Sequence, residues 1–155
     1  MNKIIGAFLL LSVALLASFA LIYKEKRRIS QLSAISELVG FIYKKIEAFN
    51  MPVPDILRSA DPVLLKNCGF ADELEFSALL SRDDLYIDEK TKSYLYDFSA
   101  GLGRSYRDEQ LRHCAYYLSE LEAYSKVQKA DYPKKRRMIL TLSVCAALGI
   151  IIIMI

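Results

Sequence analysis

The stretch ISQLSAISELVGFIYKKIEAF, residues 29–49, decides the fold of this chain because one pattern runs through all of it. Its large apolar residues recur in steps of three or four, the spacing that puts side chains on one face of an α-helix. These residues are Ile29, Leu32, Ile35, Val39, Ile42, Ile46 and Phe49. The pattern predicts a long helix with one face in a core. Residues 24–28 contain no proline or glycine, so this helix can continue without a break from the segment before it.

After this helix, prolines and small caps predict two short helices. The segment NMPVPD, residues 50–55, ends the first helix because each proline disfavours helical geometry in the residue before it. Pro54 suits the first turn of the next helix. Pro62 suits a further short helix, with Asp61 as its N-cap and Gly69 as its stop.

Three more helix starts follow. Asp72 with Glu75 has the capping-box spacing for a helix over residues 72–83, and Asp88 is placed to cap a helix that ends near Gly101. Ser105 then heads a long helix that runs to about Ala130, before Pro133 interrupts it. No segment alternates apolar and polar residues as a strand does. The fold class predicted is therefore all-α, a bundle of about five or six helices in roughly 110 residues.

Two apolar runs flank this helical region. Ile4–Tyr23 contains 20 residues and Met138–Ile155 contains 18, and neither includes a charge. As helices they would extend about 30 Å and about 27 Å, close to the thickness of the hydrocarbon core of a bilayer. We therefore expect a transmembrane helix in residues 1–23, a cytoplasmic all-α domain in residues 24–137 and a second transmembrane helix in residues 138–155.

Basic residues cluster at the inner borders of both runs. They are Lys24, Lys26, Arg27 and Arg28 after the first run, and Lys134, Lys135, Arg136 and Arg137 before the second. With Glu25 the two clusters sum to +7, whereas residues 29–133 hold 12 cations and 17 acids, a net charge of −5. Because basic flanks stay on the cytoplasmic side, we expect a two-pass protein of the cell membrane with its middle in the cytoplasm. Membrane lipids are then partners and nucleic acid is not. The competing interpretation is a cleaved signal peptide with Ser18-Phe19-Ala20 as its cleavage site.

The stretch GLGRSYRDEQLRHC, residues 101–114, raises the choice between a phosphate-binding loop and a corner between two helices. The third glycine and the lysine of phosphate loops are absent, and a helix rather than a strand precedes the stretch. We therefore expect a corner. Gly101 would adopt the left-handed conformation, and Ser105 would cap the next helix by accepting from a backbone N–H near Asp108.

Elsewhere the sequence predicts no catalytic, cofactor-binding or metal-binding residue. His113, the one histidine, is expected to be a solvated helix residue. The cysteines at positions 68, 114 and 145 share no metal-ligand spacing. Adjacent carboxylates, as at residues 83 and 84, lie in charged positions where acids are ordinarily solvated. We expect no cofactor and no enzymatic activity.

Several segments follow one another in a recognisable order. After the N-terminal apolar run come EKRRISQLSAISELVGFIYKKIE, PVPDIL, GLGRSYRDEQL, LSELEAYSKVQKA, KKRRMI and the last apolar run. In this order they resemble the stage III sporulation protein AB family over nearly the whole chain. The resemblance is strongest at a Leu-Gly-x-Ser-Asp-x-x-x-Gln pattern, which is matched by Leu102, Gly103, Ser105 and Gln110. Tyr106 stands where the family has the aspartate, which puts any role of that acid in doubt.

The resemblance implies an endospore-forming bacterium and a place in the channel complex between mother cell and forespore. It implies a helical domain similar to that of the inner-membrane platform protein F of type II secretion systems. It also implies two kinds of partner: other channel-complex membrane proteins, and a secretion-type ATPase, stage III sporulation protein AA. The expected function is a non-enzymatic platform or assembly subunit that docks this ATPase. A membrane-tethered adaptor or regulator outside any channel is the alternative, and an enzyme built on the 101–110 corner would bind nucleotide through Gly103.

Overall fold

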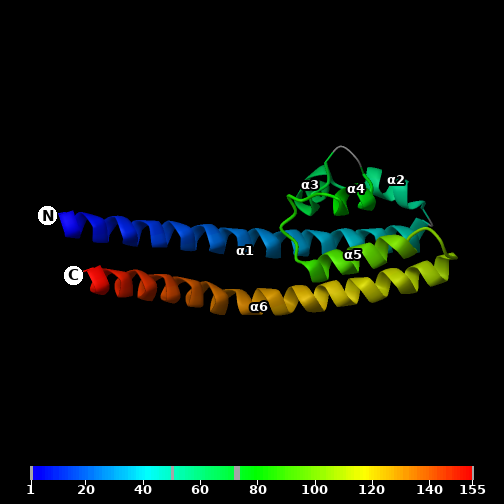
Figure 1. Ribbon diagram of the computed structural model, residues 1–155. Coiled ribbons are helices and arrows are strands. Elements are labelled where there is room, and N and C mark those ends of the chain that lie inside the picture. The colour runs from blue at the N-terminus through cyan, green and yellow to red at the C-terminus, as the bar shows by residue number, and fades with distance from the viewer. Residues whose placement is uncertain (1, 50, 72–73, 155) are drawn as a thin grey trace. The chain divides into compact units, whose positions relative to one another are not determined.

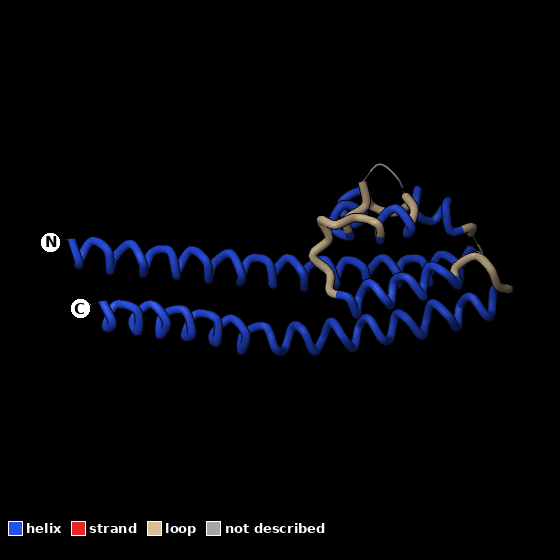
Figure 2. Tube along the Cα trace, viewed as in Figure 1, coloured by secondary structure: helices blue, strands red, loops and turns tan. Residues whose placement is uncertain are grey.

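The structure is a computed structural model that describes residues 2–49, 51–71 and 74–154, with side chains throughout these ranges from Leu11 to Ile150 and at a few residues beyond. The described residues form six helices and no strand (Figures 1 and 2). The helices are α1 (Asn2–Phe49), α2 (Val53–Arg58), α3 (Pro62–Cys68), α4 (Phe76–Leu80), α5 (Glu89–Gly101) and α6 (Arg107–Met154). The predicted all-α fold is confirmed.

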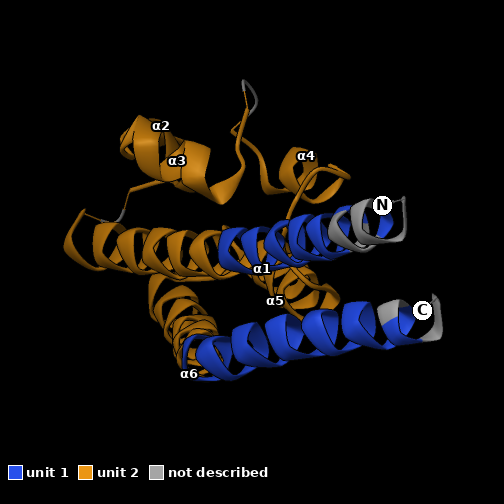
Figure 3. Ribbon diagram, turned by 90° about the vertical axis from the view of Figure 1, so that its left-hand side faces the viewer, with its two compact units in different colours: residues 1–27, 129–155 blue, residues 28–128 orange. Residues whose placement is uncertain are grey.

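The chain divides into two compact units, which Figure 3 shows in different colours. One unit contains residues 1–27 and 129–155, and the other contains residues 28–128. The long helices α1 and α6 each contribute to both units. Residues 28–128 contain all of α2 to α5 and the main hydrophobic core.

The predicted face of α1 lines the core of residues 28–128. Leu32, Ile35, Val39, Ile42 and Ile46 are each at most 2% exposed. Burial of each such side chain stabilises the fold by about 1.5–3 kcal/mol. The last residue of the predicted stripe differs from these five, because Phe49 is 66% exposed and lies under the Lys45 ammonium group. The stripe is confirmed for the five buried residues and wrong for Phe49, while its first residue, Ile29, is half-buried.

Aromatic rings join α4 to α5. The Phe98 ring of α5 is fully buried and meets the Phe76 ring of α4 edge to face, with their centroids 5.7 Å apart. Phe76 meets Phe70 in the same way at 5.6 Å. Such pairs contribute about 0.5–1.5 kcal/mol beyond the burial of their area. Within this unit, α2, α3 and α4 lie together on one side of α1 and α6 lies on the other, as Figures 1 and 3 both show.

A buried amide on α1 connects that helix to the end of α3 and to the segment between α4 and α5. The Gln31 Nε2 donates to the Cys68 carbonyl at 2.9 Å, and the Gln31 Oε1 accepts from the Tyr86 N–H at 2.8 Å. Gly69 permits this close passage, since a Cβ there would lie 2.6 Å from the Gln31 Nε2. Gln31 therefore ties three parts of the chain together.

The predicted helix caps at α3 and α5 are confirmed. The Asp61 side chain accepts from the Val63 N–H at 2.8 Å, and the Asp88 side chain accepts from the Thr91 N–H at 3.0 Å. Gly69 ends α3 with a φ of 100°, a left-handed conformation that glycine adopts without strain. These caps depend on residues only two or three positions apart, which is why the sequence reveals them.

Two predicted helix boundaries are wrong. In place of a helix over residues 72–83, α4 covers only Phe76–Leu80, because extended backbone at Glu75 precedes it. The expected cap, Asp72, lies outside the described residues. At the other boundary, α6 continues through Pro133. Pro133 is exposed, so its ring removes one backbone hydrogen bond and strains the helix without disturbing a core.

Within the described residues, no helix carries an apolar stretch of the length that crossing a membrane requires. The transmembrane helices predicted in residues 1–23 and 138–155 are therefore not supported. A span needs roughly 20 apolar residues. The unbroken described side chains of the two apolar runs extend only from Leu11 to Tyr23 and from Met138 to Ile150. Side chains of the predicted spans at residues 1–5, 7, 8, 10, 151 and 153–155 lie outside the described part.

In the unit of residues 1–27 and 129–155, small residues of α1 and α6 are buried. Ser18 is 0% exposed and Ala147 is 3% exposed. The outer faces of the same two segments expose large apolar side chains: Leu9, Val13, Leu16, Phe19, Leu21, Met138, Leu142, Leu148, Ile150 and Ile152. An exposed apolar surface of this extent marks a site of interaction with protein or lipid.

Candidate functional site: a groove beside the α5–α6 corner

The chain turns between α5 and α6 as the sequence predicted, but a different glycine makes the turn. α5 ends at Gly101 and α6 begins at Arg107. Gly103 has a φ of 78°, whereas Gly101 has no positive φ, so the left-handed conformation predicted for Gly101 is wrong. Gly101 is required for space instead. A Cβ there would lie 2.4 Å from Cε1 of the His113 ring.

His113 is packed against α5 and is not a solvated helix residue, contrary to the prediction. Its ring stacks on Phe98 with an interplanar angle of 10° and a centroid distance of 5.8 Å. Its Nε2–H donates to the Phe98 carbonyl at 3.0 Å. His113 therefore holds the start of α6 against the end of α5, a structural role.

Ser105 does not occupy the cap position of α6. The residue before the first helical residue is Tyr106, and its carbonyl accepts from the Gln110 N–H at 2.9 Å. The predicted Ser105 cap is therefore wrong by one residue, because the corner is one residue longer than predicted. Tyr106, where the family pattern has an aspartate, is 91% exposed.

A groove with a volume of about 960 Å³ opens beside this corner. Its walls come from α2 and the turn before it, from α4 and the segment leading into it, and from α5 with the corner itself. Leu57 and Phe76 form an apolar floor, 2% and 7% exposed. Three of the four predicted motif residues, Leu102, Gly103 and Gln110, line the groove. Ser105 is not among its lining residues.

Among the described residues that line the groove, two carry guanidinium groups and one carries a carboxylate. Arg58 comes from the end of α2, Arg104 from the corner and Glu75 from the segment before α4. Arg58 also pairs with Asp55 at 3.5 Å, but both side chains are more than half exposed, so this ion pair contributes little. Residues 28–128 hold 12 cations and 16 acids, a net charge of −4. Among its described lining residues the groove thus has one more cation than carboxylate, on a unit that is acidic as a whole.

Most of the cations predicted to flank a membrane lie exposed in the unit of residues 1–27 and 129–155. The exposed ones are Lys24, Lys26, Arg27, Lys134, Arg136 and Arg137. Arg27 donates to the Tyr23 hydroxyl at 2.8 Å. Lys134 and Arg137 border a hollow of about 490 Å³ together with apolar side chains of α6. Lys135 differs from these, because it pairs with Glu25 at 3.0 Å.

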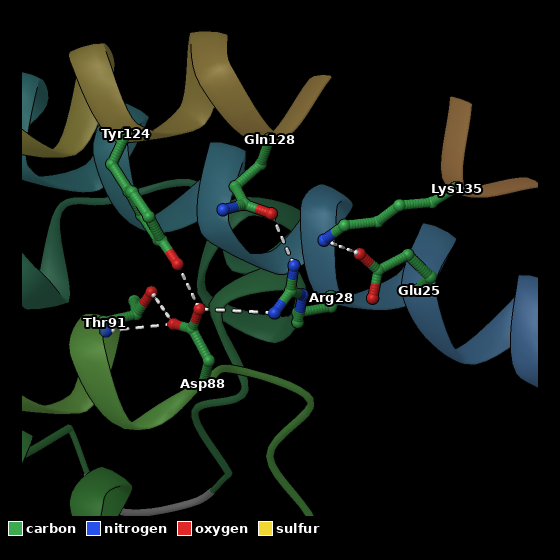
Figure 4. A network of polar contacts seen from close by, with 7 residues as sticks. All are labelled: Glu25, Arg28, Asp88, Thr91, Tyr124, Gln128 and Lys135. Carbon is green, nitrogen blue, oxygen red and sulfur yellow. Dashed lines mark hydrogen bonds and ion pairs between the residues drawn. The ribbon is translucent and has the colours of Figure 1, made fainter. Parts of the chain in front are cut away.

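Arg28, the eighth of these cations, takes part in a polar cluster within residues 28–128 (Figure 4). Its guanidinium pairs with the Asp88 carboxylate at 3.3 Å and donates to the Gln128 Oε1 at 2.5 Å. The hydroxyls of Thr91 and Tyr124 also donate to the Asp88 carboxylate. Asp88, at the start of α5, thereby connects α1 to α6.

The contacts of this cluster determine the protonation states of Asp88 and Tyr124 at neutral pH. Burial by itself would raise the pKa of the Asp88 carboxyl, but hydrogen bonds from Thr91 and Tyr124 and the charge of Arg28 outweigh burial and hold the pKa below its ordinary value of 3.8. Burial and the bond to Asp88 raise the pKa of the Tyr124 hydroxyl to about 12. At neutral pH Asp88 is ionised and Tyr124 is neutral.

Comparison with protein-family models gives one further observation. Residues 63–155, more than half of the chain, match the model described as Stage III sporulation protein AB. The chain belongs to this family. The resemblance stated from the sequence motifs is confirmed, and the protein is related to sporulation. No curated protein and no solved structure matched the chain.

The matched region of this stage III sporulation protein AB family member runs from the second residue of α3 through α6 and so includes the corner wall of the groove. The α2 wall, with Leu57 and Arg58, lies before residue 63. The sequence motif pointed to the corner and gave no signal for this second wall. The Arg28–Asp88 pair was missed as well, because its members are 60 residues apart.

No metal site is present among the described residues of the sporulation protein, where no three His, Cys, Asp or Glu side chains are grouped to hold an ion. Burial raises the pKa of the Cys68 thiol to about 12 and that of the Cys114 thiol to about 11, so both are protonated at neutral pH. The groove, with its apolar floor and mixed rim, is suited to hold the side chains of a protein partner.

Proposed function

We propose that this stage III sporulation protein AB family member is a non-enzymatic assembly subunit of the channel complex between mother cell and forespore. In this proposal residues 28–128 lie in the cytoplasm and dock a secretion-type ATPase, stage III sporulation protein AA, beside other channel-complex membrane proteins. The observation that carries the proposal is that Leu102, Gly103 and Gln110 of the family pattern line an apolar-floored groove. The domain would serve as a platform, in the manner of the type II secretion protein F.

We propose also that the unit of residues 1–27 and 129–155 attaches the protein to the cell membrane. Two observations support attachment. Large apolar side chains are exposed there, among them Leu16 at 69% and Leu142 at 62%. Exposed cations lie next to them in the sequence: Lys24, Lys26, Arg27, Lys134, Arg136 and Arg137. Apolar side chains next to Lys and Arg bind membranes that contain anionic lipids.

Affinity isolation of the full-length protein from sporulating cells tests the platform role. Membranes are solubilised in mild detergent, and the recovered proteins are identified by mass spectrometry. We expect the ATPase and integral membrane proteins to be recovered together. Recovery of soluble signalling proteins alone would favour the adaptor outside any channel, and absence of the ATPase would reject its docking.

A second measurement separates a platform from an enzyme. Titration of the full-length protein with ATP is expected to show no saturable binding. Tight binding that Gly103→Ala abolished would assign nucleotide chemistry to the corner and contradict the proposal.

A further inference from the structure

We infer that the groove beside the α5–α6 corner receives one amphipathic helix of a partner protein, whose apolar side chains enter the groove and whose carboxylates pair with Arg58 and Arg104. The inference deepens the proposed function, on which it rests only for the existence of a protein partner. It states the chemistry of the segment that binds and the place at which it binds.

The floor of the groove accepts apolar side chains. Leu57 and Phe76 lie at its base, and the half-buried side chains of Met51, Leu74 and Leu102 surround them. A volume of about 960 Å³ holds several side chains of a partner. Apolar surface of this kind gains about 25 cal/mol for each Å² that a partner removes from water.

A helix fits this site better than an extended peptide. The described residues form no strand, so they offer no sheet edge on which an extended segment could pair its backbone. The walls are the short helices α2 and α4 and the end of α5. Grooves between helices bind amphipathic helices through apolar residues at positions i, i+3 or i+4, and i+7.

Charge selects an acidic segment. Arg58 and Arg104 stand on two different walls, and Glu75 is the one carboxylate among the described lining residues. Within the described part of the chain the Arg104 side chain makes no hydrogen bond or ion pair, and the Arg58 pair with Asp55 is long and exposed. Guanidinium groups form short, paired hydrogen bonds with carboxylates. Residues 28–128 are net −4, so the two guanidinium groups favour an acidic helix at the groove against the charge of the unit as a whole.

Photocrosslinking in sporulating cells tests the occupant. A benzoylphenylalanine is introduced into the full-length protein at Tyr96, which lines the groove and is 67% exposed. The matched control is the same replacement at Tyr116, which is 57% exposed and is not a lining residue. We expect a crosslink from position 96 and none to the same protein from position 116. Mass spectrometry should map it to a segment with apolar residues at helical spacing and Asp or Glu beside them.

The same crosslink measures the role of charge. Arg104→Glu should lower the yield from position 96 at least about tenfold, because it replaces a charge-assisted hydrogen bond with a repulsive pair. Arg112→Glu, the same change at an exposed residue of α6 outside the lining, should leave the yield unchanged. A crosslink to lipid, to a basic segment or to an extended segment would overturn the inference, as would equal crosslinking from positions 96 and 116.

The outcomes keep the two proposals apart. If the ATPase is recovered with the protein but the crosslinked segment is basic, the platform role stands and the groove assignment fails. If the segment is an acidic helix of a protein other than the ATPase, the groove assignment stands and ATPase docking fails.

Discussion

One carboxylate, that of Asp88, joins three helices of the unit formed by residues 28–128. It caps α5 through Thr91, pairs with Arg28 of α1 and accepts from Tyr124 of α6. The Arg28 and Asp88 side chains are 22% and 23% exposed, so solvent screens their attraction only in part. Loss of the Asp88 charge should therefore lower the free energy of unfolding by a measurable amount.

Asp88→Asn is expected to lower the free energy of unfolding by about 1–2 kcal/mol at pH 7. The amide oxygen can still cap α5 in the place of Oδ1, but the amide nitrogen takes the place of Oδ2, so the change removes the charge and the hydrogen bonds from Arg28 and Tyr124. Because the folded pKa of Asp88 lies below 3.8, the carboxylate stabilises the fold above that value and loses its effect as the pH falls through the folded pKa. Urea unfolding measures the free energy of unfolding of the full-length variant and of the natural chain. The difference between these two free energies should become smaller below pH 3.8.

Asp61→Asn provides the control, because Asp61 also caps a helix but its side chain is exposed and, within the described residues, makes no ion pair. It should change the urea midpoint less than Asp88→Asn does. A constant difference between the Asp88 variant and the natural chain from pH 7 to pH 3 would contradict the assigned role of the charge.

Gly101→Ala is expected to destabilise the protein because the added Cβ would lie 2.4 Å from the His113 ring. Overpacking of this kind costs about 1–3 kcal/mol. When His113→Ala removes the ring, Gly101→Ala should stabilise the protein instead, since alanine is favoured over glycine in a helix and Gly101 is the last residue of α5. Thermal unfolding of the single and double variants measures this coupling.

Gly103→Ala serves as the comparison. Nothing lies within 4 Å of a Cβ there, but the φ of 78° strains any other residue. Gly103→Ala should lower the thermal stability by the same amount with and without the His113 ring. If His113→Ala failed to relieve Gly101→Ala, the close approach would not be the reason for the glycine.

Among the helices, α1 organises the unit of residues 28–128. Its apolar face supplies the core, and Gln31 fixes the chain on both sides of α4 by bonding the Cys68 carbonyl and the Tyr86 N–H. Gln31 is itself 8% exposed. The Cys68 carbonyl and the Tyr86 N–H lose their hydrogen-bond partner if the Gln31 amide is removed.

Gln31→Leu should destabilise the protein by about 2 kcal/mol or more, because each buried group left without a hydrogen bond costs about 1–3 kcal/mol. Gln110→Leu makes the same replacement at a half-buried residue whose side chain forms no hydrogen bond within the described structure, and it should have a small effect. The urea midpoints of the two variants give the comparison. Equal midpoints would mean that the Gln31 hydrogen bonds make no net contribution to the stability of the protein.

For the protein as a whole, attachment to a membrane is the property that can be measured most directly. Leu16 and Phe19 are 69% and 61% exposed in the unit of residues 1–27 and 129–155. Replacing both with glutamate should reduce flotation of the full-length protein with phosphatidylglycerol vesicles at least about tenfold, because it removes apolar contacts and adds charge that anionic lipid repels.

The control for flotation makes the same change in the other unit. Tyr96→Glu with Tyr116→Glu alters two side chains that are 67% and 57% exposed, and it should leave flotation intact. Equal loss in both double variants would show that net charge, and not the exposed apolar surface, decides the binding.

Sequence by itself determined what depends on neighbours along the chain. The buried stripe from Leu32 to Ile46 follows from helical spacing, and the caps at Asp61 and Asp88 follow from side chains that reach backbone groups two or three residues away. The Leu-Gly-x-Ser pattern placed the chain near a family that the family match then confirmed. Each of these features involves residues only a few positions apart, so it can be recognised in the sequence.

Tertiary structure decided what depends on contacts between distant residues. Only packing shows that Gly101 makes room for His113, that Arg28 meets Asp88 across 60 positions, and that α2 and α4 complete a groove whose other wall is the corner. In each case the deciding free energy comes from groups brought together by folding, which no local pattern records.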